Sequence, residues 1–292
     1  MRKFVLFYNP VSGSAAFKGK LDMMVEAFQR RGALLIPYRT KAGGNEGLID
    51  FVREVLPHGI IAAGGDGTVH EAANLIMKGR LNLPLGIIGS GTSNDFATYL
   101  GINDDLESYF DTIVEGRTRR CDLGLVGQEY FINVASAGMM TSIAHEVAPR
   151  LKNALGKNAY YLKGLGELAK FRSWKLTVTA DEQEHELEAF LFIIINSSTV
   201  GSMKHVADGV QVDDGLLDFL AVQKTGVPQL MALGKDLLAG KPVSSREGVL
   251  HLQAKCFTVK AEEELQSDLD GEAGPMLPLT VETVHKALEV YC

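Results

Sequence analysis

Two glycine-rich turns, residues 64–68 and 89–97, constrain the fold of this chain more than any other feature. Each follows an apolar run and precedes a helix-like pattern. Glycine lets the backbone approach phosphate oxygens closely, and free N–H groups at the start of the next helix point at such an anion. The two turns are therefore typical of the two halves of a nucleotide phosphate site. Because carboxylates cannot bind phosphate directly, Asp66 and Asp95 indicate a bridging divalent cation, which we favour, or a purely structural hydrogen bond.

The first third of the chain alternates between strand and helix patterns. Helical spacing of apolar residues is found around 21–28, 49–55 and 69–76. Apolar runs that indicate strands stand between these helices, at residues 3–8, 34–39, 60–63 and 85–88. This alternation predicts a doubly wound, mostly parallel sheet covered by helices, an α/β fold with ligands at the carboxyl ends of its strands. Both glycine-rich turns follow such ends.

The pattern changes after about residue 117 to short strands separated by frequent turn signals, as in a sandwich or barrel. A helix is expected near 229–238. Strands are expected at 119–126, 130–136, 175–180, 187–196, 216–222 and several positions after 249. The sequence thus predicts a nucleotide-binding domain of residues 1–125 and a β-sandwich-like domain of residues 126–292 with a helical insertion.

Charge and hydropathy restrict the partners. The net charge of −7 argues against a general nucleic-acid binder, which needs a basic face. No apolar run approaches the roughly 18 residues that span a bilayer. Residues 149–177, however, carry seven basic residues and one acid, interleaved with leucine and aromatic residues. This basic segment is expected either to lie on an anionic membrane surface or to form an ordinary solvated helix face. Three widely scattered cysteines are typical of a reduced cytoplasm.

A set of motifs follows the predicted strands in order over nearly the whole chain. They are Asn9-Pro10-Val11-Ser12-Gly13, Thr40, Gly64 to Thr68, Gly91 to Ala97, Cys121-Asp122-Leu123-Gly124 and Asp270-Gly271-Glu272. Together they resemble the bacterial diacylglycerol kinase family of soluble lipid kinases. The resemblance implies an ATP-dependent, Mg²⁺-dependent cytoplasmic enzyme that phosphorylates a lipid hydroxyl, with an N-terminal nucleotide domain and a C-terminal β-sandwich-like domain.

The resemblance also implies roles for single residues. Glu272 resembles the proton acceptor. In our own hypothesis Asp270 is a second catalytic carboxylate, which positions Mg²⁺ and its waters together with Asp66 and Asp95. Asp214, with backbone carbonyls of Gln211 and Leu216, resembles a Mg²⁺ site. The residues expected at ATP are Asn9, Pro10, Ser12, Gly13, Thr40, Gly64, Gly65, Asp66, Gly67, Thr68, Gly91, Thr92, Asn94 and Asp95. The chain departs from the family pattern at Gly89, where proline is common, and at Ser14, where many members have a basic residue.

The acidic positions near the C-terminus indicate a catalytic role even without the resemblance. Phosphoryl transfer needs a carboxylate within hydrogen-bond reach of the attacking hydroxyl. Asp268, Asp270 and Glu272 alternate, which in an extended segment places all three on one face. Such a cluster indicates a functional site, although a solvated acidic loop would have the same composition. Between Glu272 and Asp270 we favour Glu272 as the base. Asp214 lies in an ordinary hairpin signal and is a turn residue by its spacing alone.

The sequence therefore predicts a cytoplasmic, peripherally membrane-associated kinase that transfers the γ-phosphate of ATP to diacylglycerol or a similar lipid alcohol and gives a phosphatidate-type product. A homodimer is consistent with the resemblance. Two alternatives stay open: a soluble nucleotide kinase of the NAD kinase type, and a catalytically silent lipid-binding regulatory module. The acidic residues that a silent module would be expected to lose are all present.

Overall fold

The computed structural model describes residues 1–12, 17–102, 105–138 and 172–292. The chain divides into two compact units. The first unit comprises Met1–Leu123, Glu129–Ile132 and His285–Cys292, and the second comprises Gly124–Gln128 and Asn133–Val284. Most of the predicted basic segment, residues 149–171, lies outside the described residues. Within the described part of the chain, no helix is long and apolar enough to cross a membrane.

A parallel sheet forms the centre of the first unit. Its strand order is β2 (Ala33–Arg39), β1 (Arg2–Tyr8), β3 (Gly59–Gly64) and β4 (Leu85–Gly89). The run Phe4–Phe7 at the centre of β1 is fully buried, which is characteristic of a strand covered on both faces. Residues of β15 (Leu279–Tyr291) continue the sheet beyond β4, with Val290 paired to Leu85.

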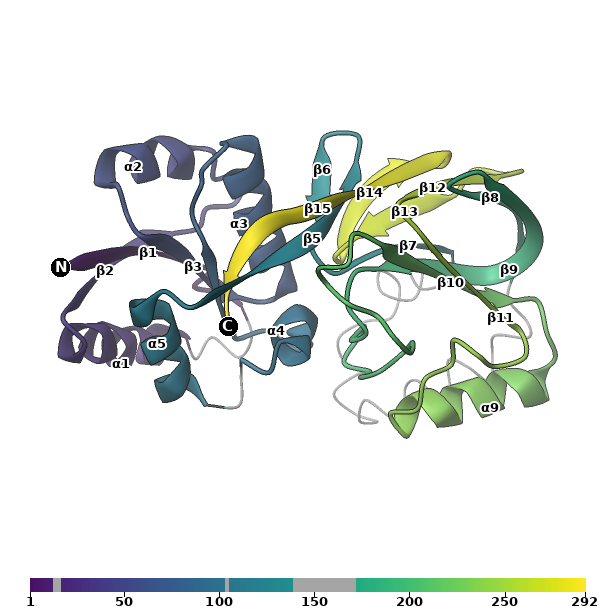
Figure 1. Ribbon diagram of the computed structural model, residues 1–292, viewed down its shortest axis with the longest axis horizontal. Helices are drawn as coiled ribbons and strands as arrows, with labels where there is room; N and C mark the ends of the chain where they lie inside the picture. The colour runs from purple at the N-terminus through teal and green to yellow at the C-terminus, as the bar shows by residue number, and fades with distance from the viewer. Residues whose placement is uncertain (13–16, 103–104, 139–171) are drawn as a thin grey trace. The chain divides into compact units, whose positions relative to one another are not determined.

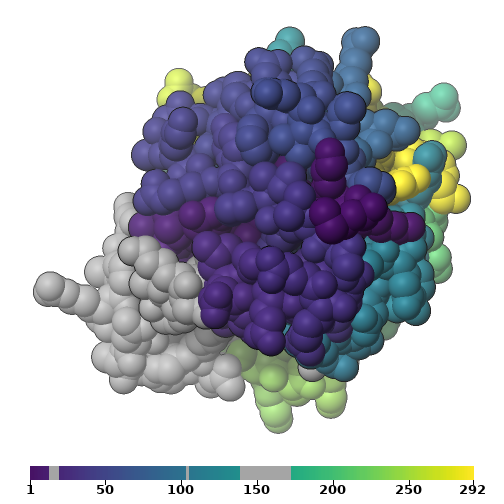
Figure 2. Space-filling view, turned by 90° about the vertical axis from the view of Figure 1, so that its left-hand side faces the viewer, coloured from purple at the N-terminus to yellow at the C-terminus, as the bar shows by residue number. Residues whose placement is uncertain are grey.

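Helices cover both faces of this sheet. They are α1 (Phe17–Arg30), α2 (Gly47–Val55), α3 (Asp66–Lys78), α4 (Asp95–Tyr99) and α5 (Leu106–Glu115). Figure 1 shows α1 and α5 on one face, where they contact each other, and α2 and α3 on the other. Figure 2 shows the surface of this unit from the side on which the N-terminal residues, purple and indigo, lie. The predicted doubly wound α/β arrangement is confirmed.

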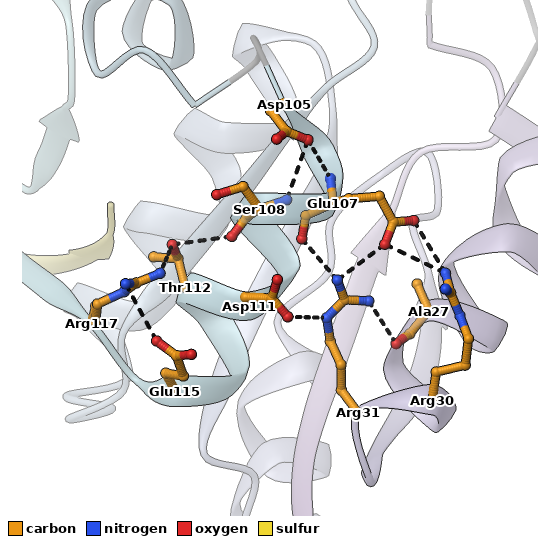
Figure 3. A network of polar contacts seen from close by, with 10 residues as sticks. All are labelled: Ala27, Arg30, Arg31, Asp105, Glu107, Ser108, Asp111, Thr112, Glu115 and Arg117. Carbon is orange, nitrogen blue, oxygen red and sulfur yellow. Dashed lines mark hydrogen bonds and ion pairs between the residues drawn. The ribbon is translucent and has the colours of Figure 1, made fainter.

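A network of ion pairs joins α1 to α5 (Figure 3). Arg31, whose side chain is only 15% exposed, donates from Nε to Asp111 Oδ1 at 2.6 Å and from Nη2 to Glu107 Oε2 at 3.0 Å. Arg30 reaches the same Glu107 at 3.2 Å. Asp105 caps α5 by accepting the N–H groups of residues 107 and 108. The cap and the arginines together fix where α5 begins and how it lies against α1.

Asp111 is expected to make the stability of the first unit depend on pH. The hydrogen bond from Arg31 is the main cause that lowers the pKa of the Asp111 carboxyl. A lowered pKa in the folded state means that the stabilisation is present above the pKa of the unfolded chain and is lost as the pH falls through the folded-state pKa. Asp111→Asn should therefore slightly lower the unfolding temperature at pH 7, and the difference from wild type should shrink as the pH falls below the ordinary pKa of an aspartate. Thermal unfolding over a pH series from 7 downward tests this, and a difference that stays constant over the whole series would contradict it.

The second unit is built from antiparallel strands. Their order is β14 (Glu272–Met276), β13 (Gln266–Leu269), β7 (Val134–Gly138), β9 (Gln183–Ile195), β8 (Trp174–Ala180), β12 (Cys256–Ala261) and β15. The long β9 pairs with β8 along its first half and with β7 and β10 (Leu217–Gln223) along its second. β11 (Val249–Ala254) pairs with β10, and α9 spans Val227–Leu238. The predicted β-rich second domain is confirmed.

One predicted strand is divided in the structure. The sequence pattern favoured a single strand over residues 130–136, but β6 (Glu129–Phe131) pairs with β5 (Thr118–Val126) and ends before β7 begins. The division falls at Asn133, whose N–H donates to the side chain of Asp270 at 2.9 Å. The Asn133 N–H thus pairs with a side chain from a distant part of the sequence, whereas in a continuous strand it would pair with a neighbouring strand.

Candidate active site

The turns after β1, β2, β3 and β4 are joined by backbone hydrogen bonds at the carboxyl end of the first unit's sheet. Asn9 N–H donates to the Ala63 carbonyl at 3.0 Å, and Ser90 N–H donates to the Gly64 carbonyl at 2.8 Å. Thr40 N–H donates in the same way to the Tyr8 carbonyl at 2.9 Å. The parallel order of the strands therefore brings the motifs predicted to bind nucleotide to one edge of the sheet, although they are spread over 87 positions from Asn9 to Asp95.

Asp66 connects the two glycine-rich turns. It is the first residue of α3, and its Oδ1 accepts the N–H of Asp95 at 2.9 Å while its Oδ2 accepts the N–H of Asn94 at 3.0 Å. Asn94 has a left-handed φ of 51° and its Oδ1 accepts the N–H of Gly91 at 2.8 Å. The structural hydrogen bond that the sequence left open is thus present at Asp66. The bridging cation that we favoured stays a prediction.

Close backbone packing explains the glycines of these turns. A Cβ added to Gly91 would lie 2.6 Å from the Gly65 Cα atom, so the two turns touch backbone to backbone. A Cβ on Gly89 would lie 2.8 Å from Asn94 Cγ. Gly89 therefore leaves room for the Asn94 side chain, at the position where the family pattern commonly has proline.

The same edge carries hydroxyl groups and a supported loop. Ser12 Oγ lies 2.9 Å from Ser90 Oγ and 3.1 Å from the Asn9 carbonyl oxygen, to which it donates. In the loop after Thr40, the buried Asn45 donates to Glu71 Oε1 at 2.7 Å. Sequence reasoning missed Ser90 and Asn45, although Ser90 stands directly before Gly91 in the second turn.

Every predicted nucleotide residue that the structure describes lies in or beside these turns, whereas Gly13 lies outside the described residues. Pro10 and Thr68 are buried, and Thr92 is exposed. Gly67 belongs to the first turn of α3. Asp95 is 7% exposed, at the start of α4. The arrangement brings glycine-rich backbone turns and the hydroxyls of Ser12 and Ser90 together at the end of one sheet, which suits phosphate groups. The carboxylates of Asp66 and Asp95 at the same place would need a cation between them and a phosphate.

The acidic positions of the second unit are arranged differently from the prediction. Asp268, Asp270 and Glu272 do not share one face of an extended segment, because the chain reverses between β13 and β14. Leu269 pairs with Glu272, and the two loop residues, Asp270 and Gly271, have φ values of 53° and 93°. An Asp-Gly pair with two left-handed residues makes a type I′ hairpin turn. The same Asp-Gly signal, visible in the sequence, could have predicted this reversal.

The hairpin separates its carboxylates by environment. Asp270 is 8% exposed, and its Oδ1 accepts the N–H groups of Asn133 and Val134, both at 2.9 Å. Asp268 is 8% exposed, and its Oδ1 accepts the Gly271 N–H at 2.8 Å. Glu272, at the start of β14, is exposed. The first two carboxylates therefore hold the hairpin together, while Glu272 can be reached from solvent.

Two further acidic residues lie in other elements. Asp214 is exposed and its Oδ1 accepts the Leu216 N–H at 2.9 Å, so Asp214, Gly215 and Leu216 form a tight turn next to the exposed Gln211. Asp122, which is fully buried in the first unit, accepts from Lys286 N–H at 2.6 Å and lies 2.9 Å from His285 Nδ1. Asp122 thus ties β5 to β15 within the first unit.

Comparison with known proteins identifies the family. The family described as diacylglycerol kinase catalytic domain matches residues 3–126, and the one described as YegS C-terminal NAD kinase beta sandwich-like domain matches residues 133–292. A diacylglycerol kinase of Bacillus subtilis (strain 168) is 32% identical over 282 residues, which are 95% of this chain and 92% of the relative. The chain belongs to the diacylglycerol kinase family. The resemblance seen in the sequence motifs is confirmed.

Further relatives agree with this membership. A diacylglycerol kinase of Staphylococcus haemolyticus is 31% identical over 294 residues, covering 99% of this chain and 88% of the relative. A crystal structure of a diacylglycerol kinase from Bacillus anthracis has a TM-score of 0.76 at 24% identity, over 99% of this chain and 96% of that one. The structural likeness shows a shared fold. This chain is thus a diacylglycerol kinase-type enzyme by family, and the kinase and transferase predictions are confirmed at that level.

Proposed function

We propose that this chain transfers the γ-phosphate of ATP to the hydroxyl of diacylglycerol or a similar lipid alcohol, giving a phosphatidate-type product and ADP. The observation that carries the proposal is the connection at Asp66, whose carboxylate holds both glycine-rich turns together at the end of a parallel sheet. In a kinase family member, such an edge is the expected place for the phosphates of the co-substrate. We assign residues 1–125 as the ATP-binding domain and residues 126–292 as the lipid- and metal-binding domain.

The first unit would hold the phosphates through backbone groups and hydroxyls. Gly65 and Gly91 bring the two turns together without side chains between them, so phosphate oxygens can approach the backbone of both turns closely. Ser12 adds a hydroxyl at the same edge. Because phosphoryl transfer depends mainly on positioning and charge stabilisation, rigid turns of this kind supply much of what the reaction needs.

Glu272 is the proposed proton acceptor for the lipid hydroxyl. Asp270 Oδ1 already accepts the backbone N–H groups of Asn133 and Val134, and moving the carboxylate away would take this acceptor from both donors. Glu272 is exposed and lies two residues further along the same hairpin. We therefore assign Glu272 to deprotonation of the hydroxyl and Asp270 to holding the hairpin that carries it.

Mg²⁺ is the proposed metal, and the available donors suit it. Within the described residues, no three His, Cys, Asp or Glu side chains form a cluster that could hold a metal ion. The proposed site instead combines the Asp214 carboxylate with backbone carbonyls of Gln211 and Leu216, all oxygen donors of the kind that Mg²⁺ prefers. Asp66 and Asp95 could hold a second ion. Mg²⁺ held by Asp66 and Asp95 would neutralise phosphate charge and orient the nucleotide, while an ion at Asp214 would have either a catalytic or a structural role.

The lipid acceptor indicates where the enzyme would act. A lipid alcohol resides in a membrane, so we propose a cytoplasmic enzyme that associates peripherally with the membrane surface. We also propose a homodimer, which is consistent with the family resemblance. The basic segment, residues 149–177, would contribute charge for this association, because lysine and arginine are attracted to anionic headgroups.

Phosphate transfer to a panel of acceptors tests the proposal. Labelled ATP with Mg²⁺ is offered with diacylglycerol, other lipid alcohols or NAD, the lipids in mixed micelles. NAD is included because a nucleotide kinase of the NAD kinase type is the first alternative, and the domain that matches residues 133–292 is described as NAD kinase beta sandwich-like. Labelled phosphatidate is the expected product. Label in NAD alone would indicate a nucleotide kinase, and the absence of transfer to every acceptor would indicate a silent lipid-binding module.

A further inference from the structure

The hairpin that carries Glu272 is held by an aspartate clamp. Asp270 begins the two-residue loop with a left-handed φ of 53°. Its N–H donates to the Val134 carbonyl at 2.8 Å, and its Oδ1 accepts the N–H groups of Asn133 and Val134, both at 2.9 Å. One residue of the loop thus makes three hydrogen bonds to two consecutive residues of a neighbouring segment.

The second unit contains the same clamp at another hairpin. Asp181 begins the two-residue loop between β8 and β9 with a φ of 50°. Its N–H donates to the Cys256 carbonyl at 2.8 Å, and its Oδ1 accepts the N–H groups of Lys255 and Cys256 at 3.1 and 3.0 Å. Asp181 and Lys255 are exposed, and Cys256 is half-buried. The same clamp therefore also forms at a hairpin on the surface of the second unit.

The clamp at Asp270 differs from the one at Asp181 in the residues that hold its partner, Asn133. Asn133, 5% exposed, donates from Nδ2 to the Thr199 carbonyl at 3.0 Å, and its Oδ1 accepts the Ser197 hydroxyl. Ser197 is fully buried and Thr199 is 3% exposed. Burying polar groups is costly unless every partner is in place, and a satisfied buried network is correspondingly rigid. The Asp181 hairpin makes the same three hydrogen bonds at the surface. The need to hold a hairpin in place therefore does not by itself explain why a buried network supports the Asp270 hairpin.

We propose that Asn133 is a positioning residue of the reaction. Its amide, held by Ser197 and Thr199, fixes the two N–H groups that bind Asp270, and through the hairpin it fixes Glu272. The inference rests on the proposed function, since it takes Glu272 as the base. A reacting carboxylate must be held within roughly 0.5 Å of its productive position, which a loop achieves only with a supporting shell.

Two substitutions and a matched control test this role. Asn133→Ala removes the amide, and Ser197→Ala removes one of its partners with a smaller change. Asp181→Asn, the control, replaces the carboxylate of the exposed clamp by an amide. We expect Asn133→Ala to lower kcat by about 10- to 100-fold, and Ser197→Ala by less, with KM for ATP within about twofold of wild type. Asp181→Asn should lower the unfolding temperature without changing kcat. If Asn133→Ala does not fold, Ser197→Ala carries the test.

The outcomes separate this inference from the proposed function. Folded Asn133→Ala or Ser197→Ala protein with wild-type kcat would overturn the positioning role, as would an equal loss of kcat in Asp181→Asn. Glu272→Gln is measured alongside. Loss of kcat in Glu272→Gln together with normal kcat in the Asn133 and Ser197 variants overturns the positioning role alone. Normal kcat in Glu272→Gln overturns the assignment of the base and the positioning role with it.

Discussion

Glu272→Gln is expected to lower kcat for lipid phosphorylation by about 10²- to 10⁴-fold, the range that general acid–base groups contribute. The amide cannot accept the hydroxyl proton, while it keeps the size of the side chain and its exposed position on β14. KM for ATP should change little, because the proposed nucleotide residues belong to the first unit. Steady-state kinetics with a diacylglycerol acceptor measures both constants.

Glu264→Gln is the matched control for this experiment. Glu264 is an exposed glutamate of the second unit and stands at the end of an acidic run, Glu262 to Glu264, outside the proposed site. Glu264→Gln removes the same negative charge as Glu272→Gln, because both replace a carboxylate by an amide of the same size. Equal kinetics in the two variants would show that Glu272 acts through charge alone or has no role in the reaction.

Gly91→Ala is expected to have the second largest effect. Its Cβ would lie 2.6 Å from the Gly65 Cα, and the neighbouring atom is backbone, so one of the two turns must move. Forcing an atom into such a contact costs about 1–3 kcal/mol in the free energy of unfolding. Displacement of the phosphate-binding edge should also raise KM for ATP by about tenfold or more. Thermal unfolding and nucleotide kinetics measure the two effects.

Gly226→Ala provides the comparison. Gly226 precedes α9 in the second unit, and its added Cβ would lie 3.1 Å from Gln229 Oε1, the end of a flexible side chain that can move. This variant should keep the KM for ATP of the wild type. Normal ATP kinetics in Gly91→Ala would contradict the role given to the close approach of the two turns.

The sequence predicted most of the first unit because its signals are local. The spacing of apolar residues indicated the strands and helices of the parallel sheet, and the glycines marked the turns at the strand ends. Parallel strand order then places those turns at one edge as a consequence of geometry. Family motifs assigned the chemistry of kinases to that edge, and comparison with relatives confirmed the family.

The second unit shows where local patterns were insufficient. Alternation of Asp268, Asp270 and Glu272 predicted one acidic face, but the Asp-Gly pair reverses the chain between them. The strand pattern over residues 130–136 did not reveal the break at Asn133. In both places a competing local or long-range contact overrides a pattern that is otherwise a sound indicator of a strand.

The sequence by itself determined the elements, the turns and the family, because these depend on residue types at short spacings. Only the tertiary structure decided which groups the carboxylates contact. Asp66 accepts hydrogen bonds from residues 28 and 29 positions away, and Asp270 accepts them from residues 137 and 136 positions away. Partners at such separations are chosen by how strands and turns pack, and this packing makes Asp270 a clamp and leaves Glu272 exposed as the proposed base.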